Sequence, residues 1–176
     1  ALQPDHLTVK LEGSAGQSLG AFAAPGLKLE VSGDANDYVG KGLSGGTIVV
    51  RPPMSSPLKA DENTIIGNTV LYGATDGYLF AAGRAGERFA VRNSGAKVVI
   101  EGCGSNGCEY MTGGVAVILG SIGANFGAGM TGGMAYLYDP EGKSAALMNM
   151  ETLVTCSVTV DHWEQQLLGL VQRHAD

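Results

Sequence analysis

The sequence predicts an all-β fold, a right-handed parallel β-helix (solenoid) of about seven coils with a C-terminal capping α-helix. Three observations lead to this prediction. Small residues recur about every 19 positions, a short β-prone run follows each recurrence, and 28 of the 176 residues are glycine. A unit of this length is too short for a strand, a crossover helix and two connections, which need roughly 30 residues. It fits one flattened coil, and such coils stack in parallel.

The repeat is clearest where Met-Thr-Gly-Gly occurs twice, at residues 111–114 and 130–133, each time followed by an apolar run. The same frame, extended backwards, places small residues at Gly26, Gly46, Gly77, Ala96, Gly114 and Gly133. The steps between them are 20, 31, 19, 18 and 19 residues. The long step is one unit plus a 12-residue insert, Pro52–Asn63, which we expect to bulge from one coil as a loop.

β-prone runs follow the frame positions at residues 27–31, 47–51, 78–82, 97–101, 115–119 and 134–138, and residues 7–11 look like the same element one coil earlier. Two further glycine columns precede the frame, one with Gly20, Gly40 and Gly127 and the other with Gly42, Gly73 and Gly129. Glycine reaches positive φ without a steric penalty, and it lets stacked backbones approach closely. The structural repeat glycines are therefore predicted to form the corners of the coils.

The frame stops after Asp139-Pro140, so we divide the chain into a β-helix domain, residues 1–149, and a C-terminal segment, residues 150–176. Asp161 followed by Glu164 indicates the start of a helix, expected at about 161–174. Its apolar residues recur at helical spacing. We expect this apolar face to pack on the end of the solenoid, where it would block edge-to-edge association.

Composition excludes several classes of protein. A formal net charge of −6 argues against a nucleic-acid partner, because phosphate binding needs a concentrated basic surface. No apolar run approaches the roughly 18 to 20 residues of a membrane span, and no signal-peptide pattern opens the chain. The absent initial Met suggests a piece of something longer. Three cysteines, Cys103, Cys108 and Cys156, fit a reducing cytoplasm better than a disulfide framework.

The sequence indicates no catalytic, cofactor-binding or metal-binding residue. Gly40-Lys-Gly-Leu-Ser-Gly45 matches a dinucleotide-binding fingerprint as a string, but a strand and two prolines follow it instead of a helix. The same string recurs in register at residues 127–132, which favours a corner. The three histidines have ordinary roles in this interpretation. Arg84, Arg88 and Arg92 leave two readings open: an inter-coil charge ladder with Glu87, or a possible inter-domain contact.

Three longer strings are more specific: residues 33–46, 83–95 and 107–114. They closely resemble the C-terminal glycine-repeat (GXGXG) domain of the large (alpha) subunit of bacterial, NADPH-dependent glutamate synthase. The resemblance implies a parent enzyme that converts glutamine, 2-oxoglutarate and NADPH into two glutamates. Ammonia released in its amidotransferase domain tunnels to a barrel domain with FMN and an iron–sulfur cluster, and a small subunit with FAD passes on electrons from NADPH. The β-helix domain is implied to be a scaffold between these domains.

The chain lacks an N-terminal nucleophilic cysteine, a barrel and a cysteine cluster, so these residues cannot carry the parent's activity alone. Two alternatives remain. The chain could be a separately encoded β-helix subunit that binds a partner enzyme, as in formylmethanofuran dehydrogenase. It could also be an independent small enzyme, which would need a cleft with convergent polar groups.

Overall fold

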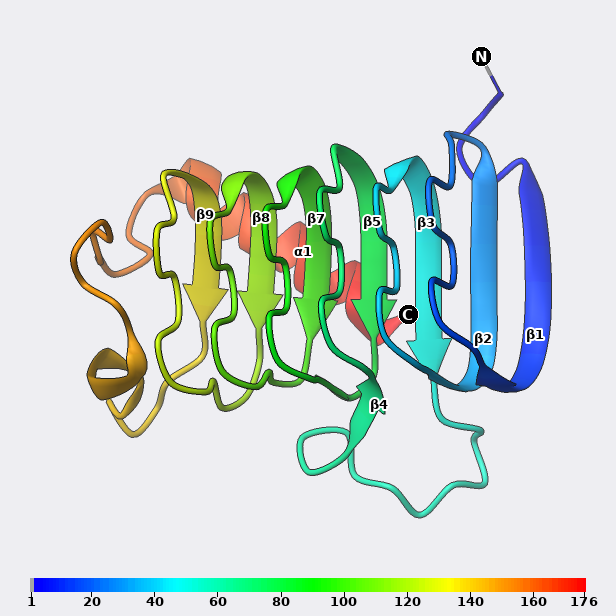
Figure 1. Ribbon diagram of the computed structural model, residues 1–176, viewed down its shortest axis with the longest axis horizontal. Helices are drawn as coiled ribbons and strands as arrows, with labels where there is room; N and C mark the ends of the chain where they lie inside the picture. The colour runs from blue at the N-terminus through cyan, green and yellow to red at the C-terminus, as the bar shows by residue number, and fades with distance from the viewer. Residues whose placement is uncertain (1) are drawn as a thin grey trace.

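The computed structural model describes residues 2–176 as a stack of short parallel strands followed by one α-helix (Figure 1). The elements of this part of the chain, in order, are β1 (Leu7–Ala15), β2 (Leu27–Ala35), β3 (Ser44–Arg51), β4 (Thr64–Ile66), β5 (Asp76–Ala81), β6 (Arg84–Ala85), β7 (Ser94–Ile100), β8 (Thr112–Ile118), β9 (Gly132–Leu137), the 3-10 helix η1 (Ser144–Leu147) and α1 (Asp161–Ala175).

Seven strands form one sheet in the order β1-β2-β3-β5-β7-β8-β9, and every neighbouring pair in it is parallel. β4 and β6 form a second, shorter parallel ladder. Each strand of the large sheet is reached one coil after its predecessor, so the chain winds as a solenoid of about seven coils. The predicted parallel β-helix is confirmed, and each β-prone run of the sequence overlaps one of these strands.

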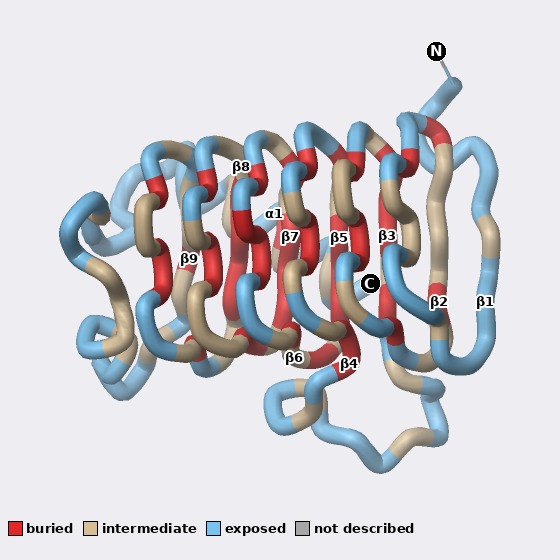
Figure 2. Tube along the Cα trace, in the orientation of Figure 1, coloured by how far each residue is buried: buried red, intermediate tan, exposed pale blue. Residues whose placement is uncertain are grey.

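The core is a column of apolar side chains from equivalent positions of successive coils. Leu29 pairs with Ile48, Ile48 with Leu79, and Leu79 with Val98. Ile48, Leu79 and Val98 have no exposed surface, and Figure 2 shows the buried positions running along the middle of the stack. Because the pairing is in register, each coil covers the apolar interior of the next.

The insert Pro52–Asn63 leaves the stack between β3 and β4, as predicted, and projects from one side of it (Figure 1). Met54, the third residue of the insert, is 89% exposed. No helix within residues 2–176 has both the length and the apolar character needed to cross a membrane.

The C-terminal helix is present where the sequence predicts it, at Asp161–Ala175, but its position on the stack differs from the expectation. It runs across the outer face of the large sheet and contacts β7 and β8 instead of covering the end (Figure 1). Leu170 packs there with Phe80, Val99 and Val117. The outward-facing row that Leu170 meets holds Phe80, Val99 and Val117, whereas Lys10 and Glu30 occupy the same row on β1 and β2.

The end of the stack beyond β9 is covered by the chain between β9 and α1. Met148 forms a parallel bridge with Phe126 of the last complete coil. Leu147, Met148 and Leu153 pack against the main core cluster. The capping role expected of the helix therefore belongs to this irregular segment, and the division of the chain at residue 149 stays a prediction.

Candidate functional site

Each coil contains a five-residue corner segment in which every second residue has a left-handed backbone. The φ angles at its first, third and fifth positions all lie between 53° and 74°. The first positions are Ser18, Tyr38, Thr69, Arg88, Asn106 and Asn125. The third are Gly20, Gly40, Leu71, Ala90, Cys108 and Gly127. The fifth are Phe22, Gly42, Gly73, Arg92, Tyr110 and Gly129.

Inter-coil hydrogen bonds hold the corner segments in this conformation. The amide of Gly40 donates to Leu19 of the preceding coil at 2.8 Å, and the amide of Gly42 donates to Tyr72 of the following coil at 2.9 Å. The same alternation recurs along the stack. A left-handed non-glycine residue costs on the order of 1–2 kcal/mol, and the ladder of inter-coil bonds offsets this cost. That explains why Leu71 and Ala90 replace glycine in a glycine column.

Several glycines are also needed because a neighbour occupies the space of a side chain. The ring of Phe22 lies over Gly42, and that of Tyr110 lies over Gly129. Among the frame residues, Gly26, Gly77, Gly114 and Gly133 have positive φ, whereas Gly46 does not and is instead confined by Ala23, Ala24 and Leu27. Gly73 has positive φ and open space around it.

Arg84, Arg88 and Arg92 make contacts between coils and do not form one cluster with Glu87. The Arg84 guanidinium reaches Ser121 Oγ at 2.5 Å and the carbonyl of Asp61, in the projecting loop, at 3.5 Å. Arg88 pairs with Glu109 of the following coil at 3.1 Å, and the charge ladder with Glu87 stays a prediction.

Arg92 lies over the ring of Tyr72 in the preceding coil, 6.0 Å from its centroid. An inter-domain contact by these three side chains remains a prediction.

The cysteines are all free, and two of them are inaccessible. Burial raises the pKa of the Cys103 thiol to about 12, and burial likewise raises the pKa of Cys108 well above its ordinary value. Neither thiol can act as a nucleophile near neutral pH. Within residues 2–176, no group of three or more His, Cys, Asp or Glu side chains is placed to hold a metal ion.

Among the histidines, within the described residues 2–176, His174 alone has a close ionic partner. Its Nε2 lies 2.6 Å from Glu101 Oε1, where it fastens the end of α1 to the residue that follows β7. His162 packs edge-to-face against Trp163.

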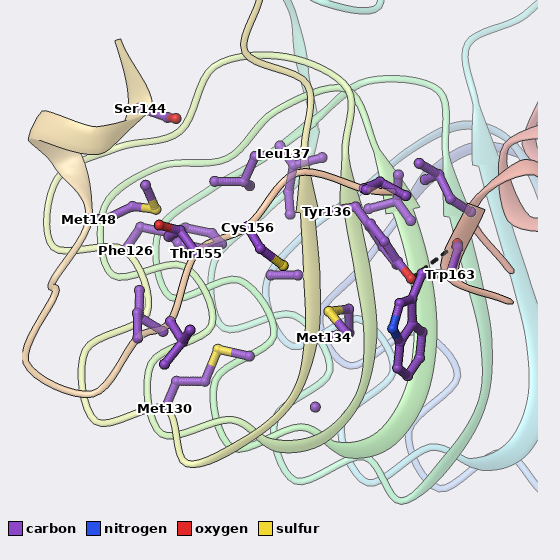
Figure 3. Close-up of a pocket in the computed structure, with 18 of the residues that line it drawn as sticks. Phe126, Met130, Met134, Tyr136, Leu137, Ser144, Met148, Thr155, Cys156 and Trp163 are labelled. Atoms are coloured by element: carbon purple, nitrogen blue, oxygen red, sulfur yellow. Dashed lines mark hydrogen bonds between the residues drawn. The ribbon is translucent and has the colours of Figure 1, made fainter. Parts of the chain in front are cut away.

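An apolar groove of about 780 Å³ lies between β9 and residues 152–158, and we call it the β9 groove. Figure 3 shows Met130, Met134 and Cys156 around it, with Trp163 on the far side. The Tyr136 hydroxyl lies 3.3 Å from the carbonyl of Trp163 and 3.0 Å from Gln166 Oε1. Most of the lining is apolar, which fits binding of an apolar group.

Sequence reasoning missed this groove. Residues 152–160, Thr-Leu-Val-Thr-Cys-Ser-Val-Thr-Val, carry a usable signal, because they are rich in β-branched residues and alternate in a β-strand pattern. Their position beside β9 depends on the solenoid as a whole.

The stacked corner segments and the packed, narrow interior define a glycine-repeat β-helix domain. The chain belongs to the GXGXG motif family, whose model matches residues 1–176. It is 69% identical over 98% of its length to the glutamate synthase [NADPH] large chain of Azospirillum brasilense, and it covers 11% of that protein.

Two further relatives show how widely this domain occurs. Identity is 57% to the glutamate synthase [NADH] of Schizosaccharomyces pombe, over 98% of the chain and 8% of that protein. It is 52% to the ferredoxin-dependent glutamate synthase 2 of Synechocystis, over 97% of the chain and 11% of that protein. The chain thus spans about a tenth of the length of these relatives.

Proposed function

We propose that this chain is the β-helix domain of a glutamate synthase large chain and that it acts as a rigid spacer between that enzyme's active sites. The observation that carries this proposal is the 69% identity over nearly the whole chain to the large chain of an NADPH-dependent glutamate synthase. The structure supports a mechanical role, because hydrogen bonds of the corner segments and the large sheet tie each coil to its neighbours.

The proposed parent converts glutamine and 2-oxoglutarate into two glutamates with electrons from NADPH. Its amidotransferase domain, its FMN and iron–sulfur synthase domain and its FAD-containing small subunit are the proposed partners, and the proposed location is the cytoplasm. This domain contributes no reacting group in the proposal. Its task is to hold the two active sites at a fixed distance, because a reactant delivered in a fixed geometry reacts more efficiently.

The test is the ratio of glutamate formed to glutamine hydrolysed by the full-length enzyme. In Gly114→Val, the new side chain would meet the carbonyl of Ala96 in the preceding coil, at a residue whose φ is +83°. We expect the ratio to fall while both half-reactions persist. Gly16→Val is the matched control, because Gly16 has open space around it and no positive φ. An unchanged ratio in a folded Gly114→Val enzyme would refute the spacer role.

A further inference from the structure

The last strand of the large sheet has a free edge. The amide of Tyr138 donates to Ile118 of β8, and the direction of backbone hydrogen bonds alternates along a strand. Ala135 and Leu137 therefore present their N–H and C=O groups away from β8. No hydrogen bond joins these groups to residues 152–158 among the residues that the structure describes.

The β9 groove lies where the next strand would be. Residues 152–158 run past β9 without helical or strand pairing, and the chain is anchored at Leu153 and again at Trp163. Leu153 packs beside Gly127 and on the core cluster, and the carbonyl of Trp163 is held by Tyr136. The span between these anchors stays apart from the edge of β9, which leaves the groove open.

The walls of the groove suit apolar side chains of varied shape. Met130, Met134 and Met148 line it, together with Trp163 (Figure 3). Methionine is unbranched and polarizable, so it adapts to different apolar partners. An occupant that pairs with the edge of β9 would place every second side chain against these walls.

The surroundings of the groove are acidic. Asp139, Glu151 and Glu164 adjoin the lining residues Tyr138, Thr152 and Trp163 along the chain, and Asp161 lies two residues before Trp163. The carboxylates of Glu151, Asp161 and Glu164 belong to exposed residues. Lys143, next to the lining residue Ser144, is paired with Glu141. Complementary charge favours a partner with basic residues at its ends.

We infer that the β9 groove binds an extended apolar peptide segment with basic flanking residues, which adds to β9 as the next strand and comes from another part of the parent polypeptide. This inference rests on the proposed function. The chain covers 11% of the NADPH-dependent relative, so most of such a polypeptide lies outside this domain and can supply the peptide segment. The groove is then a joint through which the spacer is fastened to a neighbouring domain.

The experiment uses the full-length large chain with p-benzoylphenylalanine in place of Val154. Val154 lines the groove and is 95% exposed, so the photoreactive side chain displaces nothing from the core. After irradiation, we expect one main cross-linked peptide from outside residues 1–176, with alternating apolar residues and flanking Lys or Arg. The same probe at Lys10, on the opposite end of the stack, should yield a different product.

A mixture of isotopically light and heavy enzyme identifies the source. Cross-links between light and heavy copies would mean that a second copy fills the groove. Cross-links confined to residues 130–138 would mean that residues 152–158 close on β9 themselves. Either result, or the absence of any cross-link, overturns the inference.

Hydrogen exchange of the same enzyme tests strand addition directly. The amides of Ala135 and Leu137 should exchange as slowly as that of Tyr136, which faces β8. Rapid exchange at Ala135 and Leu137 beside a protected Tyr136 would refute strand addition.

Met134→Asp should abolish the cross-link because it adds a carboxylate to the apolar wall, and Met134→Leu should retain it. Protection of Tyr136 in both variants shows that β9 is intact, and a cross-link that survives Met134→Asp contradicts the inference.

The ratio test with Gly114→Val is independent of these measurements. A lowered ratio without a cross-link leaves the spacer role standing, and a cross-link with an unchanged ratio leaves the groove standing alone.

Discussion

The backbone of this protein depends on left-handed residues that are not all glycine. Phe22, Arg92 and Tyr110 share a column with Gly42, Gly73 and Gly129, and all six have φ near +60°. A bulky residue in this conformation is unusual on its own. Here the amides of Phe22, Arg92 and Tyr110 each donate a hydrogen bond to a carbonyl of the following coil, so leaving the conformation would break a bond between coils.

Ser18→Gly should stabilise the fold by roughly 1 kcal/mol, because Ser18 is exposed and its φ of 61° is costly for any residue with a Cβ. Ser14→Gly is the matched control, since Ser14 is exposed in β1 and has an ordinary strand backbone. That change should destabilise by about 0.5–1 kcal/mol. Denaturant unfolding of both variants measures the change in unfolding free energy. Changes of the same sign in the two variants would contradict the account of the corner segments.

At the level of elements, α1 is attached to the sheet by a small apolar contact and a few polar ones. Leu170 is 5% exposed, and Arg173 lies 3.9 Å from the centroid of the Tyr78 ring. Beyond β9, η1 is fixed by Asp139, which accepts hydrogen bonds from the amides of Lys143 and Ser144. Both elements cover apolar surface that the coils themselves leave open.

Leu170→Ala should cost about 2–5 kcal/mol, because it removes the most buried side chain of α1 from its contact with Phe80, Val99 and Val117. Leu168→Ala, at a position that is 63% exposed, should change the unfolding free energy very little. Denaturant unfolding compares the two variants. Similar losses for both would show that α1 is not docked through Leu170.

Asp139 should make the stability of the segment that covers the end of the stack beyond β9 depend on pH. The hydrogen bond from the Ser144 hydroxyl, followed by that from its amide, holds the pKa of Asp139 below its ordinary value. A carboxyl group whose pKa is lowered by folding stabilises the folded state at pH values above its ordinary pKa of about 3.9. This contribution is lost as the pH falls through the folded-state pKa. Asp139→Asn should therefore be less stable than the unmutated protein at pH 7, and this difference should shrink as the pH falls through the folded-state pKa of Asp139. Unfolding at pH 7 and at lower pH values tests this, and a difference independent of pH would contradict it.

On the scale of the whole molecule, the protein is a one-dimensional stack in which each coil contacts its neighbours. The large sheet runs along the stack from β1 to β9, and the β4–β6 ladder covers only a part of it. The corner segments join neighbouring coils by hydrogen bonds. In such an architecture, an insertion within one coil is tolerated when it leaves the contacts between coils in place. The loop Pro52–Asn63 fits this rule, because it lies outside the stack.

Replacing residues 53–62 with Gly-Gly should leave the fold intact and change the unfolding free energy by no more than about 1 kcal/mol, since loop-closure entropy varies slowly with length. Arg84 would lose its contact with Asp61 but keep the one with Ser121. Deleting residues 106–110, a corner segment, should instead abolish cooperative unfolding. Circular dichroism and denaturant titration distinguish the outcomes, and a collapsed fold after the loop replacement would contradict this account.

The sequence by itself determined the solenoid. Glycine spacing, the β-prone runs and the insert at residues 52–63 are local signals, and each agrees with the strands and the loop that the structure shows. The existence and the start of α1 were also readable, from Asp161 and Glu164 near its N-terminus. These features were predictable because they depend on residues close together in the chain.

Only the tertiary structure decided where α1 lies, which non-glycine residues are left-handed, and that a groove exists beside β9. Phe80, Val99 and Val117 come from three coils, and stacking alone brings them together as a surface for Leu170. Leu71 and Ala90 adopt positive φ because their hydrogen-bond partners lie in other coils. The β9 groove forms between β9 and residues 152–158, two segments that are about 20 residues apart in the sequence. Contacts between segments that are distant in the sequence fix all three, so local sequence patterns do not determine them.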